Sequence, residues 1–409
     1  MRSFTRKGIV MPVLAGVALT AAACGGTSST NGASGTASKS ASAGSASAVS
    51  VSASSFTRDF SAMAALKPLV AKGKGKIAAI MPDTVTSTRY TEFDQPYLAE
   101  AFQKAGLSSS QYIVQNAQGS DATELTDAQS DIASGASVLI MDPIDSGVGA
   151  QIEKYAASHG AAVIDYDRLT VGGSRKYYVS FNNVEVGKLI GQGLVSCVAA
   201  WHVKKPQVLV MRGDPTDNNA TLFAEGYDAV MAPYFSSGKW VKVGQPAGTW
   251  TPSVAQTEFE QQYTAHPTMN AALTPNDENT APIITYLQTR HIPPKTFPLT
   301  GQDATLTGLQ NVLSGYQCGT AYKPIYLEAQ AAVALAMYLR AGETPPKSLV
   351  NGTTTDPKTG TKVDSVLLTP EWVTPSNMAA TVIKDSFVPA SQLCAGKYAA
   401  ACKANGITP

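Results

Sequence analysis

Polar side chains follow short apolar runs at five places along this chain. The five stretches are Pro82-Asp83, Asp165-Tyr166-Asp167-Arg168, 212–219, 275–279 and Gly301-Gln302-Asp303. They are rich in Asp, Asn, Gln and Arg, whose planar groups donate and accept hydrogen bonds in fixed pairs. Such groups suit a polyol, because each of its adjacent hydroxyls both donates and accepts. Tyr90 and Trp250 lie in predicted loops, where their rings are able to cover the apolar C–H face of a sugar.

The segments that carry these residues alternate between strand and helix from about Lys76 onward. Short, continuously apolar runs predict strands, and the amphipathic stretches between them predict helices. In a first series we expect strands over 77–81, 112–114, 138–141 and 162–166, and helices over 91–104, 122–133 and 148–158. In a second series we expect strands over 208–211, 240–243, 271–274 and 297–300, and helices over 184–201, 222–234, 254–263 and 281–289.

Continuously apolar strands that alternate with helices indicate parallel sheets buried on both faces. The two series therefore predict an α/β chain with two doubly wound parallel-sheet domains, and 409 residues are ample for two cores. Sheets of this kind bind ligands at the carboxyl ends of their strands. Because the polar stretches all follow strand ends, we expect them to contribute to one binding site.

Several motifs occur together in a fixed order. They are Tyr166-Asp167-Arg168, Val179-Ser180-Phe181-Asn182-Asn183, 213–220, Ser237-Gly238-Lys239, Asn276-Asp277, Gly301-Gln302-Asp303-Ala304, Tyr322-Lys323-Pro324-Ile325 and Leu367-Leu368-Thr369-Pro370. In this order and spacing the chain resembles the solute-binding proteins of bacterial ABC sugar importers, the D-xylose-binding type in particular. The resemblance runs from about Lys76 to about Pro389. A related multiple-monosaccharide receptor shares most of the motifs.

The resemblance implies the periplasmic binding protein type I fold, in which two α/β domains are joined by three crossing segments and close on a monosaccharide. The crossings would fall near 180–183, 322–324 and 366–369. The N-terminal domain would then comprise 56–180 plus 324–366, and the C-terminal domain 181–323 plus 367–409.

The resemblance also implies roles for individual residues. Arg89 and Arg168 would give bidentate hydrogen bonds to the sugar, and Lys323 would reach it from the second crossing. Tyr90 and Trp250 would sandwich the sugar ring. Four residues would hydrogen-bond to the remaining hydroxyls: Asp217, Asn219, Asn276 and Asp303. Two residues would orient these groups from behind: Asp167 and Gln302.

Several of these residues also have simpler interpretations. Asp217 is placed to cap the helix that follows it, which does not prevent it from binding a ligand as well. Asp167 and Arg168 would be a surface ion pair, Lys323 a solvated charge, and Trp250 a core residue.

The chain departs from the xylose-binding pattern in three places. Tyr90 stands where that pattern has Trp, which leaves the identity of the sugar open. The stretch 352–362 looks inserted before the third crossing, and a tail containing Cys394 and Cys402 extends past the usual end.

The N-terminus is typical of an exported lipoprotein. Arg2, Arg6 and Lys7 precede a short apolar stretch, 8–20, and small residues lead to Cys24. We expect 1–23 to be a signal peptide and Cys24 to be acylated; ordinary signal cleavage beside an incidental Cys is the alternative. The Ser-, Ala- and Gly-rich segment 24–55 would be a flexible leash, followed by a short helix within 56–72.

Four cysteines remain in the body of the chain. An even number in an exported protein favours disulfides, and we expect Cys394 to pair with Cys402, which leaves Cys197 for Cys318 by elimination. The four His residues have no ligand at zinc-site spacing, so we expect no metal and no cofactor.

Three functional classes compete. Transport, our preferred class, predicts a monomer that is lipid-anchored on the outer face of the cytoplasmic membrane and delivers a monosaccharide to a permease. D-xylose is the first candidate, before glucose, galactose and arabinose. An enzyme, such as a glycosidase using Asp165 and Asp167, is disfavoured because Arg168 adjoins them and keeps an Asp ionised. A sensory receptor would have the same site. The net charge of +1 and the absence of a basic run disfavour nucleic acid.

Overall fold

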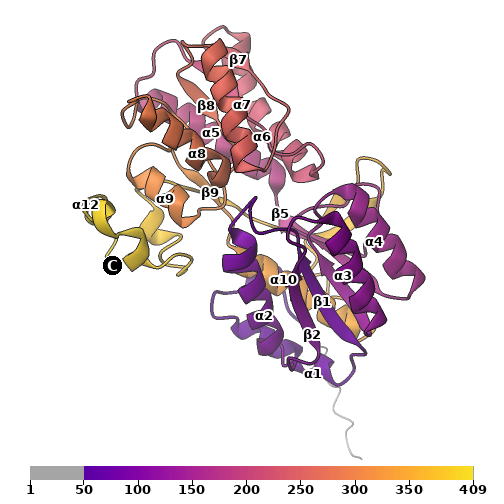
Figure 1. Cartoon of the computed structure of the whole chain (residues 1–409). Coiled ribbons are helices and arrows are strands. Elements are labelled where there is room, and N and C mark those ends of the chain that lie inside the picture. Colours follow the sequence, from indigo (N-terminus) through magenta and orange to yellow (C-terminus); the bar gives the residue numbers. More distant parts are fainter. Residues whose placement is uncertain (1–49, 409) are drawn as a thin grey trace, which may run out of the picture. The chain divides into compact units, whose positions relative to one another are not determined.

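The computed structural model of the protein describes residues 50–408 (Figure 1). Within that range, no helix combines the length and the apolar character needed to cross a membrane. The predicted signal peptide, Cys24 and the predicted leash up to residue 49 lie outside the described residues.

A seven-stranded sheet forms the first lobe, with strand order β10-β11-β5-β4-β3-β1-β2. Its strands are β1 (Lys76–Met81), β2 (Tyr112–Asn116), β3 (Ala136–Met141), β4 (Ala162–Tyr166), β5 (Tyr177–Phe181), β10 (Gly352–Thr355) and β11 (Lys362–Leu368). All neighbours are parallel except β10 and β11. The predicted strands of the first series are confirmed, and β5, β10 and β11 are additional.

Helices cover both faces of this sheet. They are α2 (Gln95–Lys104), α3 (Asp121–Ala133), α4 (Ser146–Ser158) and α10 (Ile325–Arg340). Alternate residues of β1 enter different cores: Ile77 and Ala79 share one with α2 and α10, whereas Ala78 and Ile80 share the other with α3 and α4. In Figure 1, α10 (orange) returns to the β1 and β2 group (indigo) from far along the sequence.

The second lobe contains a smaller parallel sheet of order β7-β6-β8. Its strands are β6 (Gln207–Val210), β7 (Val241–Gly244) and β8 (Ala271–Leu273). Its helices are α5 (Asn183–Ala200), α6 (Asn218–Ser236), α7 (Pro252–Ala265), α8 (Asp277–Thr289) and α9 (Leu306–Leu313). Helices α5 and α6 share a core with one face of the sheet, and α7 and α8 share a core with the other.

One predicted strand of the second lobe is wrong. The stretch 297–300 forms only an isolated bridge, in which Leu299 lies parallel to Ala272. Pro298 lacks a backbone N–H and therefore cannot donate to a continuous ladder, although its carbonyl accepts from Ala272 N at 3.0 Å.

Three chain segments connect the lobes. β5 runs into α5, and β9 (Thr320–Tyr322) runs into α10. The third segment leads from β11 into β12 (Glu371–Val373), which pairs antiparallel with β9. Leu368 at the end of β11 lies opposite Phe181 at the end of β5, so two of the connections run side by side. The three predicted crossings therefore correspond to real connections of an α/β fold with two sheets.

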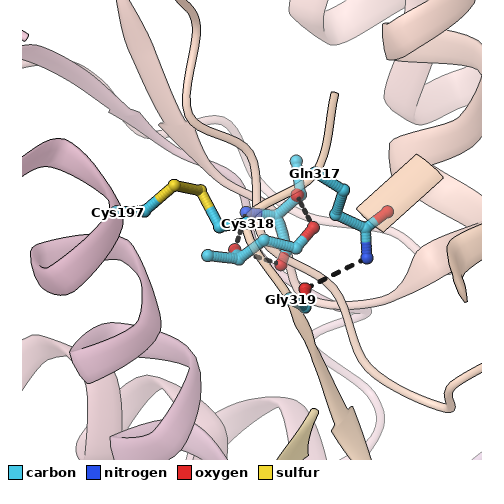
Figure 2. Close-up of a disulfide and its surroundings, with 6 residues drawn as sticks. Cys197, Gln317, Cys318 and Gly319 are labelled. Carbon is cyan, nitrogen blue, oxygen red and sulfur yellow. Dashed lines mark hydrogen bonds between the residues drawn. A yellow bond between two sulfur atoms is a disulfide. The ribbon is translucent and has the colours of Figure 1, made fainter. Parts of the chain in front are cut away.

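Both disulfides have the expected pairing. Cys197 on α5 is bonded to Cys318, which directly precedes the segment leading to β9, and thus ties a helix to the second connection (Figure 2). Cys394 is bonded to Cys402 in the C-terminal segment, where α11 (Ala390–Leu393) and α12 (Ala399–Ala404) are short helices.

The end of the predicted leash is part of the packed body. Val51 is buried, and its carbonyl accepts a hydrogen bond from the Ser348 hydroxyl at 3.0 Å, so the end of the predicted leash is packed. The expected helix within 56–72 is broken into a 3-10 helix, Ser61–Leu66, and one turn of α-helix, α1 (Lys67–Val70). A left-handed backbone at Phe60 (φ 57°) does not continue a helix, which explains the late start.

Candidate binding cavity between the lobes

Residues from both lobes line one small cavity. They are Thr86, Ser87, Arg89, Tyr90, Asp167, Arg168, Asp217, Asn219, Phe223, Trp250, Asn276, Gln302, Asp303 and Lys323. All ten residues predicted to bind a ligand are among them. The open space in the cavity, together with the solvent at its mouth, is about 300 Å³. The polar lining suits a small, polar molecule.

The carboxyl end of β4 separates two carboxylates that stand close in sequence. Asp165, inside the strand, accepts hydrogen bonds from Thr170 and lies 3.7 Å from Arg175 Nε. Asp167 follows the strand with φ 55°, which turns its side chain into the cavity. The two carboxylates required for a glycosidase are therefore not brought together.

Arg89 lies at the centre of a buried cluster of charges. Its Nε and Nη2 donate to the two Asp94 oxygens at 2.8 Å, Nη2 also donates to Glu328 Oε2 at 2.8 Å, and Nη1 donates to Asp167 Oδ1 at 2.9 Å. A guanidinium has five N–H groups, so one remains on Nη1. The expected bidentate bond to a sugar would need two N–H groups, whereas one is unused in this arrangement. Arg89 also fixes the position of Asp167.

Lys323 approaches the same carboxylate from the second connection. Its Nζ lies 3.3 Å from Asp167 Oδ1 and 3.6 Å from Asp303 Oδ1, and the residue is 2 % exposed. Burial alone would raise the pKa of Asp167, but Arg89, Lys323 and Arg168 hold it well below its usual range. Asp167 is therefore an anion, and the interpretation of Lys323 as a solvated charge is wrong.

Arg168 is oriented by its own set of acceptors. Its Nη2 donates to the Tyr90 hydroxyl at 2.8 Å, and Nη1 donates to the carbonyls of Pro143 and Ile144 at 3.3 Å each. Its Nε lies 3.5 Å from Asp217 Oδ2. Since Asp167 and Arg168 are both buried and bind other partners, the interpretation as a surface ion pair is also wrong.

Two second-lobe residues of the cavity are also helix caps. Asp217 Oδ1 accepts from Asn219 N at 2.8 Å at the start of α6, and Asn276 Oδ1 accepts from Asn279 N at 3.1 Å at the start of α8. Asp217 Oδ2 in addition accepts from Trp250 Nε1 at 3.0 Å. Capping thus fixes these side chains at the wall of the cavity and does not exclude a binding role.

Two buried acceptors of the cavity wall have no protein hydrogen bond. They are Gln302 Oε1 and Asp303 Oδ1, which follow the predicted strand at 297–300. The other Asp303 oxygen, Oδ2, accepts from the Ser87 hydroxyl at 3.0 Å. A buried acceptor without a partner costs free energy, and a ligand hydroxyl would supply the missing donor. Gln302 therefore lines the cavity itself rather than standing behind other residues.

The aromatic residues form two walls. Tyr90 is not in a loop: it begins a one-turn π-helix, Tyr90–Asp94, that continues into α2. Trp250 lies in a loop, as predicted, and packs edge-on against Phe223 with ring centroids 6.3 Å apart. A Cβ added to Gly213 would come within 2.2 Å of the Trp250 ring, so only glycine fits below it. Trp250 belongs both to the core and to the cavity wall.

A comparison with known families identifies the fold. Residues 77–344 match the periplasmic binding protein domain. The chain belongs to the periplasmic binding protein family. Parallel sheets with helices on both faces, three connections and a polar cavity at the strand ends agree with this membership.

Relatives within this family have names that refer to sugars. The D-xylose-binding periplasmic protein of Escherichia coli is 34% identical over 71% of this chain and 85% of its own length. The multiple sugar-binding periplasmic receptor of Rhizobium radiobacter is 30% identical over 80% and 94%. The crystal structure of a carbohydrate transporter solute-binding protein from Chloroflexus aurantiacus, in complex with D-glucose, is 26% identical with a TM-score of 0.68. That comparison covers 77% of this chain and 97% of the other.

Sequence reasoning missed three residues of this periplasmic binding protein cavity. Thr86 and Ser87 lie in the loop after β1, close to the Pro82-Asp83 stretch that was recognised, and Phe223 lies inside α6. Their types are common in any loop or helix, so only the rule that ligands meet strand ends pointed towards Thr86 and Ser87. Among the described residues, no group of His, Cys, Asp or Glu is suited to hold a metal ion.

Proposed function

We propose that the protein is the sugar-binding receptor of an ABC importer and that it binds a monosaccharide, D-xylose first, in the cavity between its lobes. The observation that carries this proposal is the cavity wall, where cations, anions and amides meet the aromatic rings of Tyr90 and Trp250. Fixed donors and acceptors suit the hydroxyls of a sugar, and the rings suit its C–H faces. Relatives named for D-xylose and for several sugars support the same ligand class.

The hydrogen-bonding groups left over in the wall define how a sugar would be held. The donors are one Nη1–H of Arg89, the Nε–H and one Nη2–H of Arg168, and the ammonium of Lys323. The acceptors are Gln302 Oε1 and Asp303 Oδ1. Because charged groups make the stronger hydrogen bonds, Arg168 and Asp303 would contribute most to affinity.

Binding would proceed by a hinge motion about the three connections. A ligand that contacts both lobes stabilises their closed arrangement, and so shifts the population towards it. Only that arrangement would deliver sugar productively to the permease. We further propose that the protein is exported, acts as a monomer, and is anchored through lipid on Cys24 to the outer face of the cytoplasmic membrane.

Calorimetry and thermal unfolding of the purified protein with a panel of aldoses and ketoses test the proposal. A sugar at 100 times its Kd stabilises the native state by about 2.7 kcal/mol, so the true ligand should raise the Tm clearly. We expect D-xylose to do so. If glucose, galactose or arabinose raises the Tm instead, the assigned ligand changes to that sugar, but the proposed receptor function remains. No response to any monosaccharide would refute monosaccharide binding.

Two variants test the site directly. We expect Arg168→Ala and Asp303→Ala to abolish detectable sugar binding, because each removes a charged partner that the protein itself leaves unsaturated. Glu92→Ala, at an exposed position of the neighbouring π-helix, is the control and should bind normally. Normal binding by both site variants would show that the site is elsewhere.

A further inference from the structure

The loop after β1 is tied to the second lobe by a carboxylate that does not line the cavity. Glu278, the second residue of α8, accepts from the Thr88 backbone N–H at 2.9 Å through Oε1. The same oxygen lies 3.3 Å from the Thr88 hydroxyl and 3.4 Å from the Ser87 hydroxyl. One glutamate of the second lobe thus binds Thr88 of the first lobe and lies against Ser87.

A neighbouring amide completes the attachment. Asn276 Nδ2 donates to the Thr86 carbonyl at 3.2 Å and to Glu278 Oε2 at 3.4 Å. The loop 86–88 is therefore held at three consecutive residues, and we call these contacts the clasp. The clasp stands beside the cavity, since Thr86, Ser87 and Asn276 line it, whereas Glu278 does not.

The electrostatic surroundings of Glu278 disfavour its charged form. Glu278 is half-buried, and desolvation together with the charges of Asp303 and Asp277 raises its pKa, so the ionised form depends on hydrogen bonds from the first lobe. The Thr88 N–H and hydroxyl of the first lobe provide those bonds, while the single Ser87 hydroxyl hydrogen is donated to Asp303 Oδ2 at 3.0 Å. Separating the lobes would break them all at once.

We propose that Glu278 is a positioning residue that fastens the closed arrangement of the two lobes and slows the release of sugar. The inference rests on the proposed sugar binding. Apparent affinity scales with the fraction of protein in the binding-competent arrangement, so a clasp that favours closure tightens binding without touching the ligand. Removal of the clasp should lower the affinity for every sugar by the same factor and leave the order of the affinities unchanged.

Glu278→Ala tests the clasp, with D-xylose and D-glucose as the probes. We expect the Kd for each sugar that binds to rise roughly tenfold, the effect of one lost charge-assisted hydrogen bond, and the rise to lie in koff measured by stopped flow. Glu278→Gln keeps an acceptor oxygen but loses the charge, and should have a smaller effect. Glu92→Ala removes a carboxylate that takes no part in the clasp and should match the wild type.

The outcomes separate failure of the clasp from failure of sugar binding. If the wild type binds sugar and Glu278→Ala has the same Kd and koff, the clasp alone is overturned. A change in the ratio of the Kd values for the two sugars would also overturn it. If the wild type bound neither sugar, the proposed function would be refuted. X-ray scattering without sugar would still test the clasp: a larger radius of gyration in Glu278→Ala than in the wild type supports it, and equal radii overturn it.

Discussion

Two buried arginine clusters of the first lobe are built from the same residue types but differ in what completes them. Arg89 binds Asp94, Asp167 and Glu328. Arg175 binds Asp356 at 2.8 Å. Two further carboxylates, those of Glu153 and Asp165, each lie 3.7 Å from Arg175. Asp165 and Asp167, two residues apart, belong to different clusters.

Backbone N–H groups close the Arg175 cluster. Asp356 accepts from Gly172 N at 2.8 Å, Lys358 N at 2.9 Å and Thr359 N at 3.2 Å, and Asp165 accepts from Thr170 N at 2.6 Å. Asp356 lies in the turn between β10 and β11, so the cluster pins that hairpin to the loop after β4. Backbone groups of the chain thus satisfy Asp356 and Asp165, whereas Glu153 Oε1 and Arg175 Nε have no hydrogen bond to any described residue.

The Arg89 cluster ends in side chains that face the cavity. Asp167 Oδ1 receives Arg89 and Lys323, and one N–H of Arg89 and the Lys323 ammonium still have hydrogen-bonding capacity. From this difference we infer two rules. A buried ion cluster has a structural role when backbone N–H groups satisfy its carboxylates. It is available for ligand binding when flexible side chains satisfy them. The same substitution in each cluster should therefore have opposite consequences.

Of the matched changes in the two clusters, Asp167→Asn is expected to have the larger effect on sugar binding. Loss of this charge leaves Arg89 and Lys323 without a shared partner and disrupts the charge pattern of the cavity. We expect sugar affinity to fall at least about 100-fold, equivalent to about 2.7 kcal/mol, when it is measured by calorimetry. A variant that bound within threefold of the wild type would contradict the assignment of this cluster to the site.

Sequence patterns predicted most of the fold, because its strands and helices follow from local hydrophobic patterns. Apolar runs marked the central strands. The hairpin strand β10, Gly352–Thr355, is half exposed and rich in Thr, so it lacked that signal and its stretch was recognised only as an insertion. Pro298 interrupted the run at 297–300.

The sequence predicted most of the residues that line the cavity, but it did not predict which hydrogen bonds each side chain makes. Strand ends and the family motifs pointed to ten of the fourteen lining residues as ligand-binding. One of the four N–H groups that Arg89 uses within the protein donates to Glu328, which lies far along the chain on α10, and no local pattern reveals such a partner. The left-handed backbone of Asp167, which separates it from Asp165, is likewise set by tertiary structure.

An intermediate effect is expected from Asp356→Asn, the matched change in the other cluster. It removes the charge that neutralises Arg175 and weakens the attachment of the β10–β11 hairpin. We expect the free energy of unfolding in urea to fall by about 2–3 kcal/mol. Sugar affinity should stay within twofold of the wild type. A loss of affinity as large as that of Asp167→Asn would abolish the distinction between the clusters.

The smallest effect on sugar binding is expected at Glu124, a buried carboxyl group of α3 outside both clusters. Its Oε2 accepts from Ile144 N at 3.2 Å, and its Oε1 has no protein partner. Burial raises the pKa of Glu124 from 4.5 to about 8, against the opposing effects of the Ile144 N–H and Arg168. A carboxyl group without an arginine of its own is therefore kept neutral, in contrast to Asp167.

The pKa of Glu124 makes stability depend on pH. Below about pH 4.5 the group is protonated in both states, so the full stability is present; as the pH rises towards 8, the unfolded state ionises first and stability is lost. Glu124→Gln cannot ionise, so its loss of unfolding free energy between pH 5 and 8 should be smaller than that of the wild type by roughly 3–4 kcal/mol. Urea unfolding at several pH values measures this difference. Parallel pH profiles for the two proteins would mean that Glu124 ionises in the folded state and that burial without an arginine does not keep it neutral.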